Sequence, residues 1–244
     1  RAVQLGLPVE KALQMATIQP ARCYGLYQLG MIAPGRQADF VILDSVTDLN
    51  VVDVYHCGKK IIKDEKMEVK PCPPHLKNTV HVSGFSEERL KLKHSGEKAH
   101  VIQMLEKQIV TKHIIEEVPC AEKDGEKYFE SNEEYQKIAV IERHKNTGKM
   151  GVGIVKGYGI RGGAIASSVS HDSHNIIVVG DNDHDMALAV KEMIRTQGGY
   201  TLVCNGEIYG TLPLPVMGLM SDAGYESVNE ALARMIPKAH EMGV

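Results

Sequence analysis

A proline-dense segment near one third of the chain limits what the sequence can fold into. Residues 70–75 read Lys-Pro-Cys-Pro-Pro-His. Proline has no N–H to donate, so neither a helix nor a central strand can run through this segment. We therefore predict a domain boundary here, with residues 71–77 as a linker between a short first region and a longer region at 78–244.

The first region combines short helices with short strands. Apolar residues at helical spacing predict a helix near 9–16, and Pro20 opens a second short helix. Strands are expected at 38–44, 51–55 and 60–62, and the unbroken apolar run 40–43 predicts a strand that is buried on both faces. Three short strands cannot form a stable sheet alone. Since the chain also begins without Met, we expect a fragment whose first region lacks its partners.

The second region predicts a mixed α+β domain. Segments such as 164–174 are too short for a crossover between parallel strands, so we expect a largely antiparallel sheet flanked by helices. Apolar stripes predict helices at 186–193 and at 228–236, the latter interrupted at Pro237. Asn205-Gly206 between two apolar runs predicts a tight hairpin. The expected strands are 99–105, 137–143, 151–156, 163–169, 175–179, 199–204 and 208–214.

Composition excludes several classes of protein. The 28 basic and 31 acidic residues give a net charge of -3, and aromatic residues make up 5% with no Trp, so we expect no nucleic-acid partner. No apolar run approaches the ~20 residues that span a bilayer, so we expect no membrane segment. Five widely spaced cysteines without a C-x-x-C pair indicate a reduced, cytoplasmic protein.

Two motifs resemble ligand-binding motifs, one for a dinucleotide and one for calcium, but each departs from the pattern that such a site requires. Residues 157–162 match G-x-G-x-x-G, but the motif leads into an apolar strand, whereas a dinucleotide site requires it to open a helix. Residues 181–185 together with Glu192 approach the spacing of a calcium loop. The sixth position is Met186 instead of Gly, so helix capping is the favoured interpretation. The P-C-x-x-C pattern of zinc deaminases and the motif H-E-x-x-H are absent.

One polar cluster stands between two apolar strands. Its side chains offer acid, base, hydroxyl and amide groups, so a ligand site and a hydrogen-bonded turn are equally compatible with it. A weaker candidate group lies at the end of another strand. The main cluster is His171, Asp172, Ser173, His174 and Asn175, and the weaker group is Glu142, Arg143 and His144.

The sequence resembles a known family. Residues 13–17, 20–22, 25–26, 30, 34–35 and 38–41 resemble the amidohydrolase superfamily just after its barrel. Residues 140–144, 163–168, 171–176, 214–215 and 218–222 are similar to the C-terminal part of the bacterial adenine deaminase family. The likeness covers nearly the whole chain and is weakest across 70–135.

This resemblance implies a fold and an activity. Residues 1–30 would end a (β/α)8 barrel, 31–70 would form part of a composite β-sandwich, and 78–244 would be most of the C-terminal α+β domain. The full-length protein would hydrolyse adenine with a binuclear manganese or iron centre. No metal ligand or catalytic residue can be assigned here, because the sequence contains no H-x-H.

We therefore expect the fragment to be inactive and to bind none of these metals. We also expect a homo-oligomer, and a chain cut at both ends. Two alternatives remain open: a non-catalytic domain that binds a purine or mediates assembly, and another amidohydrolase that acts on a cyclic amide or amine. The polar cluster and residues 218–222 speak against the second.

Overall fold

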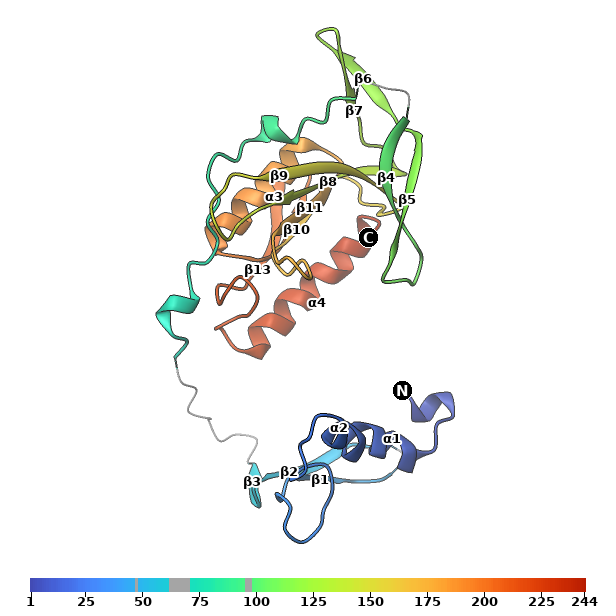
Figure 1. The fold of residues 1–244 in the computed structure, drawn as a ribbon, viewed down its shortest axis with the longest axis vertical. Helices are drawn as coiled ribbons and strands as arrows, with labels where there is room; N and C mark the ends of the chain where they lie inside the picture. Colours follow the sequence, from blue (N-terminus) through green and yellow to red (C-terminus); the bar gives the residue numbers. More distant parts are fainter. Residues whose placement is uncertain (47, 62–70, 95–97) are drawn as a thin grey trace. The chain divides into compact units, whose positions relative to one another are not determined.

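The computed structural model describes residues 1–46, 48–61, 71–94 and 98–244. The chain divides into two units, Arg1–Lys70 and Pro71–Val244 (Figure 1). The predicted linker 71–77 belongs to the second unit, where Pro74–Leu76 forms the short helix η2. The assignment of the parts to a barrel, a sandwich and a C-terminal domain stays a prediction.

The first unit holds short helices and a small antiparallel sheet of order β1-β2-β3. Its elements are η1 (Val3–Leu5), α1 (Val9–Ala16), α2 (Ile18–Cys23), β1 (Phe40–Leu43), β2 (Val51–His56) and β3 (Lys59–Ile61). Residue 62, which closed the third predicted strand, lies outside the described residues.

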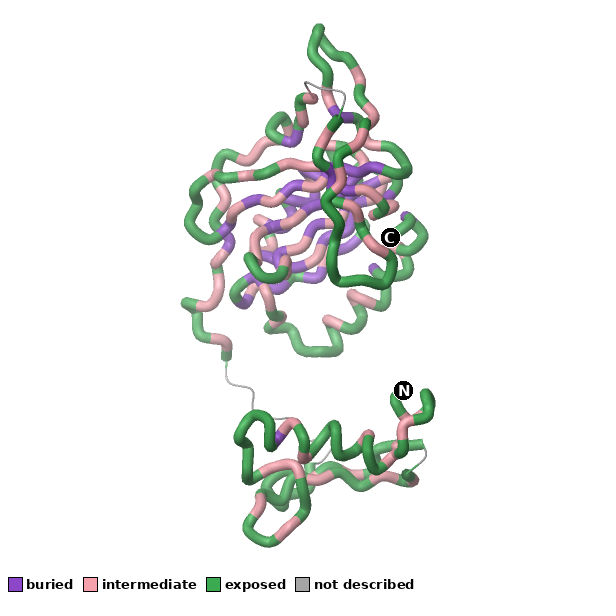
Figure 2. The backbone as a smooth tube through the Cα atoms, turned by 45° about the vertical axis from the view of Figure 1, so that its right-hand side comes forward, coloured by how far each residue is buried: buried purple, intermediate pink, exposed green. Residues whose placement is uncertain are grey.

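Strand β1 is not buried on both faces as its apolar run predicts. Val41 is 52% exposed and Ile42 is 42% exposed. The prediction is wrong for this unit because, among the residues that the structure describes, β1 lies at the edge of the small sheet and pairs with β2 alone. In Figure 2 nearly all of this unit is drawn as exposed or intermediate.

The second unit is built on an eight-stranded sheet of order β13-β12-β10-β11-β8-β9-β4-β5. Every neighbouring pair is antiparallel except β4 with β9. The strands are β4 (Lys98–Met104), β5 (Thr111–Glu117), β8 (Tyr135–Ile141), β9 (Met150–Lys156), β10 (Gly163–Ser167), β11 (Ile176–Gly180), β12 (Gly199–Cys204) and β13 (Glu207–Pro213). The mixed α+β class is therefore confirmed.

Two helices pack on opposite faces of this sheet. Successive residues of a strand point to opposite faces. Val178 of β11 packs in the cluster that contains α3 (Asp183–Thr196), while its neighbour Val179 packs in the cluster that contains α4 (Tyr225–Glu241). The central strands are thus covered on both sides, as their continuous apolar sequences require.

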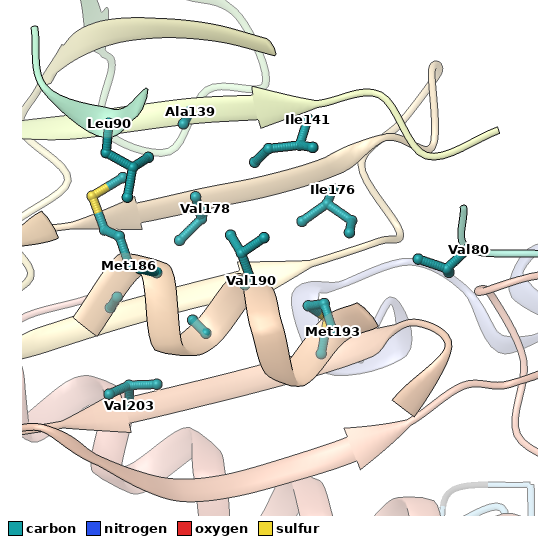
Figure 3. Packing of buried hydrophobic residues seen from close by; sticks show 14 residues of the cluster. Val80, Leu90, Ala139, Ile141, Ile176, Val178, Met186, Val190, Met193 and Val203 are labelled. Carbon is teal, nitrogen blue, oxygen red and sulfur yellow. The ribbon is translucent and has the colours of Figure 1, made fainter. Parts of the chain in front are cut away.

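The core between α3 and the sheet is the best-buried part of the chain (Figure 3). Met186, Val190 and Met193 follow helical spacing and point at Ile176 and Val178 of β11. All five side chains are fully buried. Each contributes about 1.5–3 kcal/mol relative to an exposed position, so this core holds the strands that carry the polar cluster.

The calcium interpretation of residues 181–185 fails and helix capping is confirmed. Asn182 is the N-cap of α3, and its side chain accepts a hydrogen bond from the Asp185 N–H at 2.8 Å. Asp183 pairs with Lys137, and Glu192 pairs with Arg195 at 2.7 Å. These carboxylates already have protein partners.

Some predicted elements differ from those observed. Helix α4 runs through Pro237 to Glu241 instead of being interrupted there. Proline removes one hydrogen bond, but Met235 and Met242 on either side are buried against the sheet and hold both halves. The sequence analysis missed β5 and the hairpin of β6 (Cys120–Lys123) and β7 (Glu126–Phe129). The short helix η3 (Glu87–Leu90) was also missed.

The glycine-rich segment 157–162 is a loop between β9 and β10. No helix follows it, so the dinucleotide interpretation is excluded, as the sequence analysis expected. None of the helices in the described part of the chain has the length and apolar composition that crossing a bilayer requires.

Candidate functional site

The main polar cluster forms a turn between β10 and β11, and we call residues 171–175 the polar turn. His171, Asp172 and Ser173 are exposed, whereas His174 and Asn175 are partly buried. His171 Nδ1 lies 2.6 Å from Asp172 Oδ1. The His174 N–H donates to the Ser170 carbonyl at 2.6 Å. The turn therefore presents its first three side chains to solvent and anchors its last two in the unit.

Arg143 holds this turn in place by hydrogen bonds to main-chain carbonyls. It follows strand β8 and is 1% exposed. Its guanidinium donates to three main-chain carbonyls, from Nε to His174 at 2.5 Å, from Nη2 to Met217 at 3.0 Å and from Nη1 to Thr79 at 3.3 Å. We call this arrangement the Arg143 junction. It joins three segments that lie 31 to 74 residues away from Arg143 in sequence.

Packing and charge around the Arg143 junction are tight. A Cβ on Gly218 would lie 2.7 Å from Arg143 Nη1, so only glycine fits beside the guanidinium. Among the described residues, no carboxylate lies within ion-pair distance of Arg143. Desolvation lowers the pKa of Arg143 from its usual value. The positive charge is thus balanced only by carbonyl dipoles.

Two further side chains brace the same segments. His144 Nε2 lies 2.9 Å from the Ser173 carbonyl oxygen. Ser168 Oγ donates to the Gly218 carbonyl at 2.6 Å and accepts from the Gly199 N–H at 2.7 Å. In addition to Arg143, His144 therefore holds the polar turn and Ser168 holds the segment 216–220.

Three buried polar atoms near this junction have no partner among the described residues. They are Thr79 Oγ1, His174 Nδ1 and Asn175 Oδ1. Buried polar groups are nearly always hydrogen-bonded, so unpartnered ones point to a water, an ion or a group from outside. Two of the three belong to the polar turn, which makes it the best candidate for a ligand contact in this unit.

Glu142, one of the weaker candidates, organises a loop. Its carboxylate accepts from the N–H groups of His144 at 2.5 Å, Lys145 at 2.7 Å and Thr147 at 3.0 Å. The Thr147 hydroxyl also donates to it at 2.8 Å. These bonds, led by the Thr147 N–H, lower the pKa of Glu142 from 4.5 to about 2. All acceptor positions serve the loop 144–147.

We predict that protonating Glu142 loosens this loop. Because the pKa is lowered in the folded chain, the stabilisation is fully present above pH ~4.5 and is lost as the pH falls through about 2. The Thr147 amide resonance should therefore titrate with a midpoint near pH 2, and Glu142→Gln should abolish this transition. A midpoint near pH 4.5 would show that the carboxylate does not hold the loop.

The first unit contains a set of potential metal ligands that the sequence analysis missed. Asp39, His56 and Cys57 place one ligand atom each within 4.8 Å of one another, and theirs is the only such group of three or more among the described residues. Adjacency of His56 and Cys57 was the sole sequence signal. Asp39 comes from 17 residues earlier and joins them only through the fold.

Two parts of the chain match known protein families. Residues 108–244 match the family described as the adenine deaminase C-terminal domain. The chain belongs to the adenine deaminase family. Residues 2–83 also match the amidohydrolase family, so the two matches meet the two parts of the chain in which the resemblance was seen.

Curated relatives carry the same name. A protein named adenine deaminase from Desulfitobacterium hafniense is 49% identical over 244 residues, which is all of this chain and 42% of the relative. Adenine deaminases from Nitratidesulfovibrio vulgaris and Clostridium acetobutylicum are 42% and 41% identical over 98% of this chain and 42% of each relative. The chain thus spans less than half the length of these adenine deaminases.

Proposed function

We propose that this chain is the C-terminal part of an adenine deaminase, a hydrolase that converts adenine and water into hypoxanthine and ammonia. The observation that carries this proposal is the family match over 108–244, in the unit that holds the polar turn. Relatives named adenine deaminase align with the whole chain and support it. We further propose a cytoplasmic homo-oligomer.

In this proposal the polar turn faces the mouth of the catalytic barrel, in the same subunit or a neighbouring one. Adenine offers ring nitrogens that accept hydrogen bonds and an amino group that donates them. His174 Nδ1 and Asn175 Oδ1 have no hydrogen-bond partner within the described part of the chain, so they are suited to meet such groups or a lid over them. The role of the Arg143 junction is to fix where these atoms lie.

The resemblance to amidohydrolases implies a binuclear manganese or iron centre. The ligands of the described residues do not fit it, because the only group of three is exposed and includes a thiol. Hard ions such as manganese favour carboxylate, carbonyl and water ligands. We therefore propose that the metal ligands belong to the part of the relatives that this chain does not span, and we derive no catalytic step through a metal.

We predict that the 244-residue chain alone does not deaminate adenine, even with manganese or iron added. The full-length protein should release hypoxanthine and ammonia and should lose activity with a chelator. Hypoxanthine is measured by its absorbance or by chromatography, against a control that contains metal only. Hypoxanthine production by the isolated chain above that control would contradict the assignment of its role.

A second candidate function is favoured by the same unpartnered atoms. A non-catalytic domain that binds a purine would also use His174 Nδ1 and Asn175 Oδ1. Calorimetry separates the two, because this function requires the isolated chain to bind adenine by itself. In our proposal the chain supplies only one wall of the site, so adenine should bind the full-length protein and not the isolated chain.

A further inference from the structure

The three potential metal ligands of the first unit form a connected cluster, which we call the Asp39 cluster. Asp39 precedes β1, His56 ends β2, and Cys57 begins the turn to β3. Asp39 Oδ1 lies 3.1 Å from His56 Nδ1. Cys57 Sγ lies 3.7 Å from His56 Nε2. Asp39 and Cys57 thus contact different ring nitrogens of His56, and one ligand atom from each of the three side chains lies within 4.8 Å of the others.

The fold holds these three residues together through main-chain bonds. Cys57 and Gly58 form a two-residue hairpin turn with φ of 50° and 76°, between the pair His56 and Lys59. The Cys57 N–H donates to Asp39 Oδ1 at 2.7 Å, and the Gly58 N–H donates to the Ala38 carbonyl at 2.8 Å. The carboxylate is therefore positioned by the turn itself and not by a chance side-chain contact.

The cluster is open to ions in solution. The side chain of His56 is 65% exposed, that of Asp39 is 33% exposed, and Cys57 is exposed. One ion binds a single ring nitrogen of His56, so the side chains turn toward it while the main-chain bonds of the turn stay in place.

The donor set selects a class of metal. Zn²⁺ binds Cys sulfur at ~2.3 Å, His nitrogen at ~2.0–2.1 Å and carboxylate oxygen at ~2.0–2.2 Å in a tetrahedron, with water at an open position. Thiolate and imidazole favour zinc over magnesium, calcium and manganese. We propose that the Asp39 cluster is a surface zinc site, where Asp39, His56 and Cys57 bind one Zn²⁺ and a water completes the tetrahedron.

Zinc binding would deprotonate the Cys57 thiol and would stabilise the hairpin. The Cys57 thiol releases its proton to solvent as the Zn–S bond forms. The ion would link the segment before β1 to the β2–β3 turn, which are 17 to 18 residues apart. Because it binds only the folded hairpin tightly, zinc should stabilise this unit. The proposal does not depend on the reaction that the full-length protein catalyses.

Titration of the 244-residue chain with Zn²⁺ and Cd²⁺ tests the site. We expect one ion per chain in competition with a chromophoric chelator, and ultraviolet charge-transfer absorbance from a Cd–thiolate bond. Cys57→Ser should abolish this absorbance and should leave the turn intact, because the Cys57 main chain makes the bond to Asp39. The matched control is Cys120→Ser, which removes another exposed thiol and should change nothing.

Asp39→Asn and His56→Ala separate a folded site from binding by a flexible chain. Outer-shell partners of metal sites are already worth ~10–100-fold in affinity, so each of these variants should weaken zinc by at least ~10-fold. Amide exchange should also slow at residues 54–58 when zinc is added to the wild-type chain only. Thiolate absorbance that persists in Cys57→Ser, or equal affinity in Asp39→Asn and wild type, would overturn the proposal.

Discussion

His174→Ala in the full-length protein should lower kcat/KM for adenine by ~100-fold or more, the usual worth of a positioned polar group in general acid–base or hydrogen-bonding roles. The melting temperature should hardly change. The reason is that Arg143 binds the main-chain carbonyl of His174, which the substitution keeps, while the lost Nδ1 has no hydrogen-bond partner among the residues that the structure describes. Steady-state kinetics and thermal unfolding of the same preparation measure both quantities.

Two further variants sharpen this test. Asp172→Asn removes an exposed charge that pairs with His171, so it should also reduce activity without loss of stability. His184→Ala is the matched control, because His184 is an exposed histidine of the same unit at the start of α3. If His174→Ala lowers the melting temperature and leaves kcat/KM per folded molecule intact, the polar turn is only structural.

Arg143→Ala should destabilise the unit Pro71–Val244 by at least ~3 kcal/mol. The substitution leaves three carbonyl oxygens without their donor, and each unsatisfied buried group costs ~1–3 kcal/mol. Arg143→Lys should fall between wild type and Ala, since one ammonium cannot reproduce the planar geometry of the guanidinium. Urea unfolding followed by circular dichroism measures the difference.

Arg161→Ala provides the comparison for Arg143. Arg161 is 63% exposed and lies 3.7 Å from Glu133, an arrangement that contributes at most about 1 kcal/mol. Its removal should leave the urea midpoint nearly unchanged. A loss below ~1 kcal/mol for Arg143→Ala would mean that the three segments are held by their packing and not by the guanidinium.

Local patterns predicted most strands of the second unit and both of its long helices. The Asn205-Gly206 hairpin lies where its turn chemistry requires, between β12 and β13. Strand β5 was missed because its sequence, Thr-Lys-His-Ile-Ile-Glu-Glu, is largely polar and lies at the edge of the sheet, where water can solvate one side. The predicted interruption of the last helix at Pro237 was wrong, because the packing of α4 against the sheet outweighs the one hydrogen bond that proline removes.

The candidate site was only partly predictable. The polar turn was visible as a run of polar residues between apolar strands, although its function stays a prediction. The contacts of Arg143 were not visible, because its partners are main-chain carbonyls 31 to 74 residues away and a carbonyl leaves no mark in the sequence. The Asp39 cluster was missed because Asp39 is distant in sequence from His56 and Cys57, and only the fold brings it to the hairpin.

Arg143 holds the polar turn through main-chain carbonyl oxygens. The position of the turn therefore does not depend on which side chains the turn carries. Carbonyl oxygens belong to the main chain, so side-chain substitutions at 174 and 217 keep these anchor atoms where the new residue accepts the positive φ of 51° and 58°. The exposed side chains at 171–173 can therefore vary without removing the bonds that Arg143 makes. Randomising them in a library should yield folded variants at high frequency.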